Sequence, residues 1–302
     1  MRLHVQHDTV YDYRPAVETA QHTAHLRPRS TALQEVLDFA LHISPTPEAL
    51  EQALDAFGNP QAWWSLSQAH AQLRVSAHSQ VLTRAPLALS SAQAWEPVRE
   101  HFRYRSGHRG DPNIGMVFAS HHAPIHDSFA SYARSCFAPG RPLHEAAVAL
   151  MQKIHTELSY ESQSTDVHTP ALDALQARRG VCQDFAHILI ACLRSLGLAA
   201  RYVSGYLLTQ PPEGQARLIG ADASHAWASV YLPELAESPC GGWLDLDPTN
   251  NRAGFGAPGE DYVVVAWGRD FADVSPLRGV LQGGQSHTLQ VAVSVTPVPD
   301  AA

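Results

Sequence analysis

The chain has 302 residues, of which 45% are hydrophobic and 17% are charged, and this composition is typical of a soluble globular protein. That length is enough for two compact domains with a substantial core. The formal net charge is −8 and the isoelectric point is near 6.1. Nucleic-acid-binding proteins normally carry a strongly basic surface, so we expect no nucleic-acid partner.

The first residues of the chain and its cysteines indicate the cellular compartment of the protein. The first residues alternate between polar and apolar and lack the apolar segment of a signal peptide. No run of about 18 apolar residues occurs, so we expect no membrane-spanning helix and no membrane partner. The four cysteines form no CxxC pair, which argues against a disulfide framework and against structural zinc. We therefore expect a cytoplasmic protein.

The chain contains 18 histidines, and most of them are spread along the sequence. The closest grouping is His121, His122 and His126, which we interpret as a solvated loop rather than a set of metal ligands. No HExxH motif occurs, which argues against a metal-dependent hydrolase. We predict no metal and no other cofactor.

Residues 1–85 have the pattern of a β-rich domain. Apolar and polar side chains alternate over residues 3–13, and further extended runs are separated by turn sequences such as those at 45–47 and 57–60. Several short strands at this spacing predict a small antiparallel β-sandwich. Residues 86–135 are mixed and turn-rich, and we interpret them as a connector that packs on the following domain.

Residues 136–302 combine helical and extended patterns. Residues 142–158 are helical in pattern, and a second helical stretch ends at Gly180. The helix that begins at Cys182 is apolar on nearly every side, which is typical of a helix buried in a domain centre. Several strands follow, the last of them near the end of the chain. The predicted fold class is α+β: an N-terminal antiparallel β-sandwich, then a catalytic core in which this buried helix packs on an antiparallel sheet.

Cys182 stands where a glycine-containing turn meets the buried helix. The first turn of a helix has free N–H groups and a partial positive charge, and both favour a thiolate over a thiol. The same N–H groups are placed to stabilise the oxyanion of a tetrahedral intermediate. Cys192 lies in the middle of the same helix among apolar residues and is better explained as a packing residue.

His225 and Asp247 lie on two strands that we expect to form a hairpin. If residues 232–240 are the loop and Tyr231 faces Gly241, His225 lies directly opposite Asp247. Facing residues have Cβ atoms about 4.5–5.5 Å apart, close enough for a carboxylate to hold an imidazole in one tautomer. Asp245 lies on the same face and is the alternative partner, and a slip of one residue would break the pairing.

Several motifs in a fixed order resemble the transglutaminase-like superfamily. They are RGVCQDFAH, ARYVSGYL, ASHAW and GWLDLDPTN. The early motifs YDYRP, LRPR and DAFGN resemble the N-terminal domain of bacterial members, and the later VAWGRDFADVSPLRGV resembles the same proteins. The resemblance implies a papain/transglutaminase-like core. It also implies that Cys182 is the nucleophile, His225 the base and Asp247 the orienting acid.

The chain departs from the transglutaminases of animals in two places. Those enzymes carry a tryptophan beside the nucleophile and another well upstream that holds the oxyanion. Here Gln183 follows Cys182, and no tryptophan lies between Trp95 and Trp227. Tyr160 is a candidate substitute as oxyanion donor, with a core or rim aromatic as the alternative interpretation.

These features predict cysteine-dependent acyl transfer on a peptide or protein substrate, through a thioester. We favour amide or peptide hydrolysis, because water is always present and the animal tryptophan pair is missing. Transamidation of protein glutamine by the same triad is the alternative. A non-catalytic binding or scaffold protein is the alternative from another class. The sequence defines neither the natural substrate nor the oligomeric state.

Overall fold

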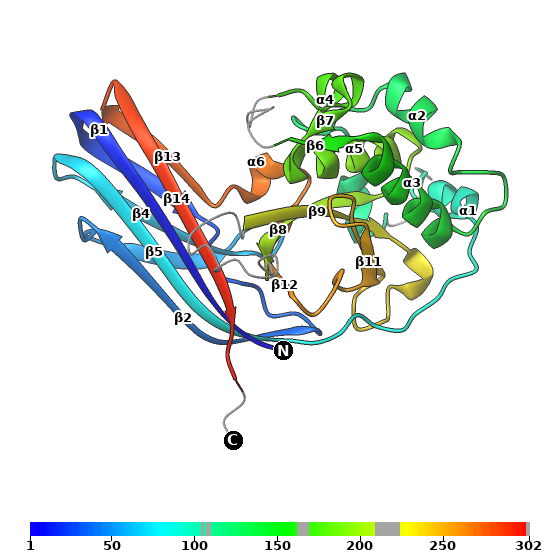
Figure 1. Cartoon of the computed structure of the whole chain (residues 1–302), viewed down its shortest axis with the longest axis horizontal. Coiled ribbons are helices and arrows are strands. Elements are labelled where there is room, and N and C mark those ends of the chain that lie inside the picture. Colours follow the sequence, from blue (N-terminus) through cyan, green and yellow to red (C-terminus); the bar gives the residue numbers. More distant parts are fainter. Residues whose placement is uncertain (104–105, 107–109, 162–168, 209–223, 300–302) are drawn as a thin grey trace, which may run out of the picture.

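The computed structural model describes residues 1–103, 106, 110–161, 169–208 and 224–299. It has two parts, a sheet of long curved strands and a core in which helices pack on a second sheet (Figure 1). The α+β class that the sequence predicted is confirmed.

The first part is a seven-stranded antiparallel sheet built around one long central strand. Its strands are β1 (Arg2–Ala24), β2 (Gln34–Ser44), β3 (Leu50–Leu54), β4 (Pro60–Leu66), β5 (His70–Thr83), β13 (Leu277–Gly283) and β14 (Ser286–Pro297). The pairing of β1 with β5 is interrupted between Asp12 and Val17, and an interruption of this kind bends a strand. In place of two stacked sheets, this single sheet curves into a half-barrel (Figure 1).

The last two strands belong to the N-terminal sheet. β14 pairs with residues 3–14 of β1, and β13 pairs with residues 17–24. The sequence pattern predicts the closing strand within the catalytic core, in a domain of residues 136–302, whereas the structure pairs it with β1. The alternating pattern that identifies such a strand does not indicate which sheet it joins, so its partner was not readable from the sequence.

Residues 86–135, which we predicted to be a connector, hold short helices in their described part. These are α1 (Trp95–His101), η1 (Pro112–Val117) and α2 (Asp127–Arg134). Val98, Met116 and Phe129 are buried in the same hydrophobic cluster as the central helix of the core. The segment therefore packs as part of the core.

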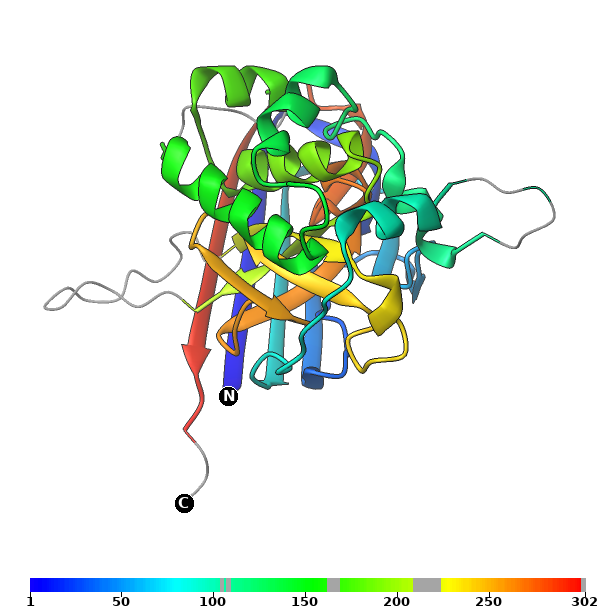
Figure 2. The same cartoon turned by 90° about the vertical axis from the view of Figure 1, so that its right-hand side faces the viewer.

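The second part is organised around helix α5 (Cys182–Ser195) and a five-stranded antiparallel sheet in the order β11-β10-β9-β8-β12. The strands are β8 (Ala200–Leu207), β9 (Ser224–Tyr231), β10 (Trp243–Asp247), β11 (Arg252–Phe255) and β12 (Tyr262–Gly268). The remaining elements are α3 (Leu143–Glu157), β6 (Ser159–Tyr160), α4 (Ala171–Ala177), β7 (Arg179–Gly180), η2 (Pro233–Leu235) and α6 (Phe271–Val274). The larger helices gather on one side of the sheet (Figure 2). Within the described ranges, no helix is both long and apolar enough to cross a bilayer.

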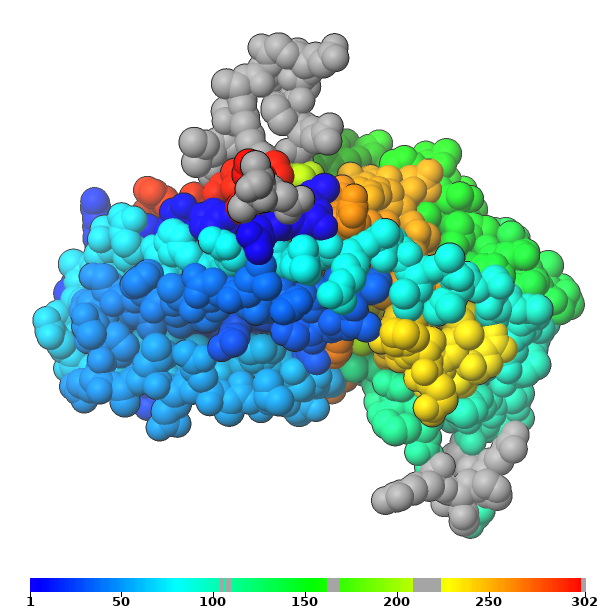
Figure 3. Space-filling view, turned by 90° about the horizontal axis from the view of Figure 1, so that it is seen from below, coloured from blue at the N-terminus to red at the C-terminus, as the bar shows by residue number. Residues whose placement is uncertain are grey.

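The sheet and the core share one hydrophobic cluster. Leu3, Val5 and Val81 of the half-barrel belong to the same cluster as Ile188 of α5 and Val230 of β9. Seen from below, the blue strands of the half-barrel abut the yellow and orange segments of the core (Figure 3). The half-barrel is therefore packed against the core over a broad surface.

Arg194 near the end of α5 is a buried cation that ties several segments together. Its side chain is 1% exposed and donates to the carbonyl oxygens of Met116, Ala200 and Arg269 at 2.7–3.2 Å. Burial lowers the pKa of Arg194 to about 10, so the group stays charged at neutral pH. We expect Arg194→Ala to lower the free energy of unfolding by about 3 kcal/mol, because buried acceptors lose their donor.

Urea unfolding monitored by circular dichroism measures this effect. Arg74→Ala is the control, because Arg74 is exposed on β5, and surface substitutions usually change stability by less than about 0.5 kcal/mol. Equal stability of the two variants would contradict the structural role of Arg194.

Candidate active site

Cys182 is the first residue of helix α5. Asp184 accepts a hydrogen bond from the backbone N–H of Val181 at 2.8 Å, which fixes where the helix begins. Gly180 allows this close approach, because a Cβ atom there would lie 2.7 Å from a carboxylate oxygen of Asp184. Cys182 is a free thiol and is half-buried. The N–H groups and the partial charge of the first helical turn favour an anion at this position.

His225, at the beginning of β9, links the thiol to a carboxylate. Its Nε2 lies 2.7 Å from Oδ2 of Asp247, and its side chain is 8% exposed. The imidazole also lies beside the Cys182 side chain, which contributes to raising its pKa. Since Nε2 is engaged by Asp247, Nδ1 is the nitrogen that remains for proton exchange with the sulfur. The structure thus brings the three predicted residues together.

The carboxylate of Asp247 is fully buried and surrounded by donors. Oδ2 accepts hydrogen bonds from the Asn250 side chain at 2.8 Å and from the Tyr262 hydroxyl at 2.7 Å, besides that from His225. Oδ1 accepts from the backbone N–H of Thr249 at 2.9 Å. This network holds the carboxylate ionised and fixes its orientation towards the imidazole.

The electrostatics of the pair favour charge separation. Burial lowers the pKa of His225, but the hydrogen bonds to Asp247 and Cys182 and their charges outweigh it and raise the pKa from 6.5 to about 10. Burial raises the pKa of Asp247, but the hydrogen bonds from His225, Asn250 and Tyr262 outweigh it and bring the pKa below its ordinary value. At neutral pH an imidazolium therefore lies beside a carboxylate, and an imidazolium stabilises a neighbouring thiolate.

The predicted hairpin register was wrong by two residues. Tyr231 faces Trp243 rather than Gly241, because the loop continues through Gly241 and Gly242, both with positive φ. A shift of two residues keeps every side chain on its original face. Asp247 is therefore diagonal to His225 instead of directly opposite, and the hydrogen bond between them is still made.

Asp245, the alternative partner, has another role. Its Oδ1 accepts hydrogen bonds from the Trp227 indole at 2.9 Å and from the Ser229 hydroxyl at 2.7 Å. Burial raises the pKa of Asp245, while the charge of Arg201 works in the opposite direction. Asp245 thus fixes the strand that carries His225, and Asp247 is the carboxylate that contacts the imidazole.

Tyr160, the candidate oxyanion donor, lies at the rim. Its backbone pairs with Gly180, two residues before Cys182, through the short strands β6 and β7. Its side chain is 53% exposed, and the ring meets that of Phe185 edge-on at 6.4 Å. This position agrees with the interpretation as a rim aromatic. The oxyanion role of Tyr160 stays a prediction.

The histidine grouping is explained by packing in the described part of the chain. The ring of His122 stacks on that of His187 at 5.1 Å, and His126 accepts the N–H of Ser128 at the start of α2. His187 is buried on α5, and burial with the neighbouring charge of His122 lowers its pKa to about 3. Among the described residues, no group of three or more histidine, cysteine or acidic side chains is arranged to hold a metal ion.

Asn250 and Tyr262 are two residues of this site that were not predicted from the sequence. Asn250 ends the DPTN sequence, so its place beside Asp247 was available as a signal. Tyr262 comes from β12, on the far side of β8 and β9 in the sheet order, and no local pattern connects it with Asp247. Its contact is visible only in three dimensions.

We expect Tyr262→Phe to lower kcat/KM about tenfold, because loss of one hydrogen bond to a buried carboxylate costs about 1.4 kcal/mol in its positioning. Steady-state hydrolysis of a peptide amide measures this. Tyr206→Phe is the matched control, since it removes a buried hydroxyl hydrogen bond of 2.9 Å to His7 instead. Equal losses in the two variants would show that the Tyr262 hydroxyl has no specific part in the site.

Comparisons with known proteins identify the class. Residues 130–248 match the transglutaminase-like superfamily, and residues 3–82 match the bacterial transglutaminase-like N-terminal region. An uncharacterized protein of Mycobacterium tuberculosis is 37% identical over 302 residues, covering 98% of this chain and 93% of that protein. The chain therefore belongs to the transglutaminase-like superfamily.

Two further similarities are to a solved structure and to part of a longer enzyme. A solved structure from Cytophaga hutchinsonii, described as "a Putative Cysteine Protease", covers 100% of this chain and 92% of that one, with a TM-score of 0.72 and 23% identity. This confirms the fold over the whole length. A protein-glutamine gamma-glutamyltransferase of Pseudomonas aeruginosa is 29% identical over 117 residues, which are 36% of this chain and 17% of that protein.

Proposed function

We propose that the protein is a cysteine-dependent hydrolase of peptide or carboxamide bonds. The observation that carries this proposal is the hydrogen bond of the His225 imidazole to the buried Asp247 carboxylate, with the Cys182 side chain beside the same ring. A thiol, an imidazole and a carboxylate in this order are the parts of an activated nucleophile.

The proposed reaction has two halves. The Cys182 thiolate attacks the carbonyl carbon, and the oxyanion is stabilised by N–H groups of the first turn of α5. The C–N bond breaks as Nδ1 of His225 gives its proton to the leaving amine, and a thioester remains. His225 then takes a proton from water, the hydroxide attacks the thioester, and the carboxylic acid leaves with regeneration of the thiolate and imidazolium.

Asp247 acts through His225 in both halves. It holds Nε2, so the ring keeps Nδ1 directed at the sulfur, and its charge stabilises the imidazolium. Asn250 and Tyr262 position Asp247 in turn.

Transamidation is the second candidate, and the similarity to the gamma-glutamyltransferase over 117 residues favours it. In that case a primary amine replaces water in the second half, and an isopeptide bond forms. Two features support water as the acceptor. Gln183 stands where animal transglutaminases have a tryptophan, and the thiol of Cys182 is half-buried rather than sealed from solvent.

One experiment separates these reactions. The protein is incubated with a peptide containing an internal glutamine, with and without a labelled primary amine, and the products are identified by mass spectrometry. Backbone cleavage or conversion of glutamine to glutamate supports hydrolysis, and incorporation of the label supports transamidation. Any of these products formed equally well by Cys182→Ser would contradict the whole proposal.

A further inference from the structure

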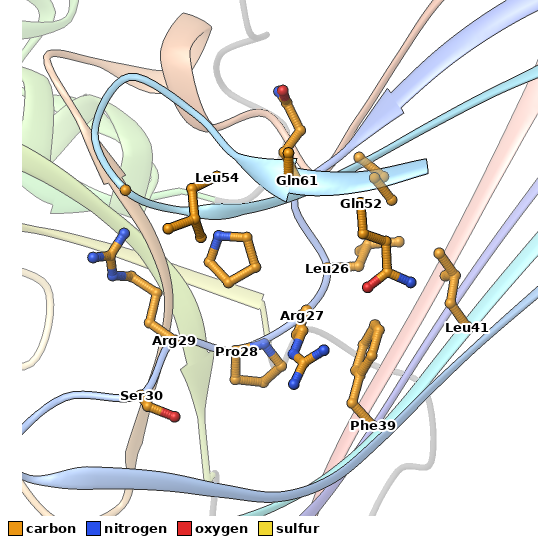
Figure 4. A pocket seen from close by; sticks show the side chains of 15 residues that line it. Leu26, Arg27, Pro28, Arg29, Ser30, Phe39, Leu41, Gln52, Leu54 and Gln61 are labelled. Carbon is orange, nitrogen blue, oxygen red and sulfur yellow. The ribbon is translucent and has the colours of Figure 1, made fainter. Parts of the chain in front are cut away.

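We propose that the hollow of the half-barrel is a binding site for an extended acidic peptide, separate from the catalytic centre. A cavity of about 480 Å³ lies there between β2, β3 and residues 26–30 (Figure 4). This volume lies in the range of about 300–1,000 Å³ that is usual for ligand sites. The site is new with respect to the triad, because none of the triad residues lines it.

The walls of the cavity are largely apolar. Leu26 is buried, while Phe39 and Leu41 of β2 are half-buried, and all three side chains line the hollow (Figure 4). Leu54 of β3 lines it too and is 68% exposed. When a ligand covers an exposed leucine at the mouth of an apolar cavity, the removal of its surface from water makes the free energy of binding more favourable.

The charge of the lining favours an anion. Arg27 and Arg29 belong to it, whereas the chain as a whole has a net charge of −8 and no acidic residue is among those that line the cavity in the described structure. Arg29 is held in place by Asn59 at 2.6 Å and by stacking on Trp267 at 3.6 Å. Arg27 is exposed and lies over the ring of Phe39 at 5.6 Å, so its charge faces the cavity and solvent.

An edge strand forms one wall of the cavity and favours an extended peptide. β3 pairs with β4 on one side, no other described strand pairs with it, and all five of its residues are exposed. Such an edge presents backbone N–H and C=O groups to which an added strand can bind. Gln52 points into the cavity across from Arg27 (Figure 4), whereas Glu51 lines a different hollow. The side of β3 that faces the cavity therefore carries no negative charge that would repel an acidic peptide.

The cavity is connected to the catalytic centre through β12. The backbone N–H of Arg29 donates to the carbonyl oxygen of Val264 at 3.1 Å. Tyr262, which holds Asp247, lies two residues earlier on the same strand, about 7 Å away. A peptide bound in the hollow is thus anchored to the strand that positions the triad. If the bound peptide is part of a substrate, the hollow anchors that substrate, and this role rests on the proposed function. The existence of the binding site does not rest on it.

The test uses the full-length Cys182→Ser protein, so that binding is measured without turnover. The probe is a fluorescein-labelled peptide of alternating leucine and glutamate, and binding is followed by fluorescence anisotropy. We expect saturable binding that Arg27→Glu weakens at least about tenfold, because an attraction becomes a repulsion. Arg74→Glu is the matched control: it makes the same charge change at an exposed position of β5 and should leave binding unchanged.

Two altered probes define the occupant. A peptide with lysine in place of glutamate should not bind, and a peptide with an N-methylated backbone should bind more weakly, since it cannot pair with the edge of β3. Absence of saturable binding, or equal weakening by Arg27→Glu and Arg74→Glu, would overturn the proposal. The proposal would also be overturned if dodecanoate displaced the probe and N-methylation left the affinity of the probe unchanged. The hollow would then be a site for an acyl chain.

The outcome is independent of the catalytic proposal. If the wild-type protein hydrolyses peptides while Cys182→Ser binds no probe, the binding site is excluded and the proposed function stands. If the probe binds with the expected dependence on Arg27 and no thiol-dependent activity is found, the binding site stands and the proposed function fails.

Discussion

We expect Cys182→Ser to lower kcat/KM for amide hydrolysis by at least about 10⁴-fold. The sulfur of Cys182 at the start of α5 is the only protein atom that forms a bond to the substrate carbon in the proposed reaction. A serine hydroxyl ionises far less readily, and the imidazolium of His225 is tuned to stand beside a thiolate rather than to deprotonate an alcohol. Hydrolysis of a fluorogenic peptide amide measures the loss, together with labelling by an electrophilic amide mimic.

The matched control is Cys240→Ser. Cys240 is also a half-buried free cysteine, but its sulfur lies 3.2 Å from the Ser238 hydroxyl. It lines a hollow that contains no residue of the triad. We expect this variant to keep its activity and to be labelled at residue 182. Labelling of Cys240 in preference to Cys182, with activity retained by Cys182→Ser, would remove the thiol from the mechanism.

Replacing Asp247 by asparagine should lower kcat by about 10³–10⁴-fold while the fold is retained. The amide can donate a hydrogen bond to Nε2 and so favours the tautomer with the proton on Nδ1, and it no longer stabilises the imidazolium. The pKa of His225, which is raised to about 10 largely by its contacts with Asp247 and Cys182 against the effect of burial, should fall. Alkylation of Cys182 as a function of pH reports this change.

The same substitution changes how stability depends on pH. A raised pKa of His225 stabilises the folded state fully below pH 6.5, and that contribution is lost as the pH rises to about 10. The depressed pKa of Asp247 stabilises the folded state above its ordinary pKa of 3.8, and that contribution is lost on acidification. Urea unfolding should therefore show a fall in wild-type stability from pH 6.5 to about 10 that is much smaller in Asp247→Asn.

Asp245→Asn is the control for loss of a buried carboxylate on the same strand. It should destabilise the protein, because the buried Arg201 cation loses the charge of Asp245 while Trp227 and Ser229 keep only a neutral amide oxygen as acceptor, yet it should leave the alkylation profile of Cys182 in place. If the two aspartate variants shift that profile equally, Asp247 has no special relation to His225.

The central part of the site was predictable because its determinants are local. A cysteine after a glycine turn and before an apolar run has to lie at a helix start, and α5 begins at Cys182. Strand alternation placed His225 and Asp247 on one face, and a register error of two residues left that face unchanged. The alternation of side chains thus predicted correctly which side chains share a face. It did not predict which residues of the two strands pair.

What the sequence did not reveal depends on contacts between distant segments. The turn through Gly241 and Gly242 sets the register by its backbone conformation, and glycine permits many conformations. Tyr262 reaches Asp247 from a strand on the other edge of the sheet. The curvature of the half-barrel and the pairing of β14 with β1 are likewise properties of the whole sheet, so no local sequence pattern predicts them.

The pairing of β13 and β14 with β1 has a consequence for biosynthesis. The ribosome releases β1 long before these two strands, so one flank of β1 has no neighbour until residues 277–297 emerge. Domains usually fold as the chain is made, in order from the N-terminus. Here β1 cannot complete its pairing until residues 277–297 have been made, and an unpaired edge of this length exposes the nascent chain to aggregation until then.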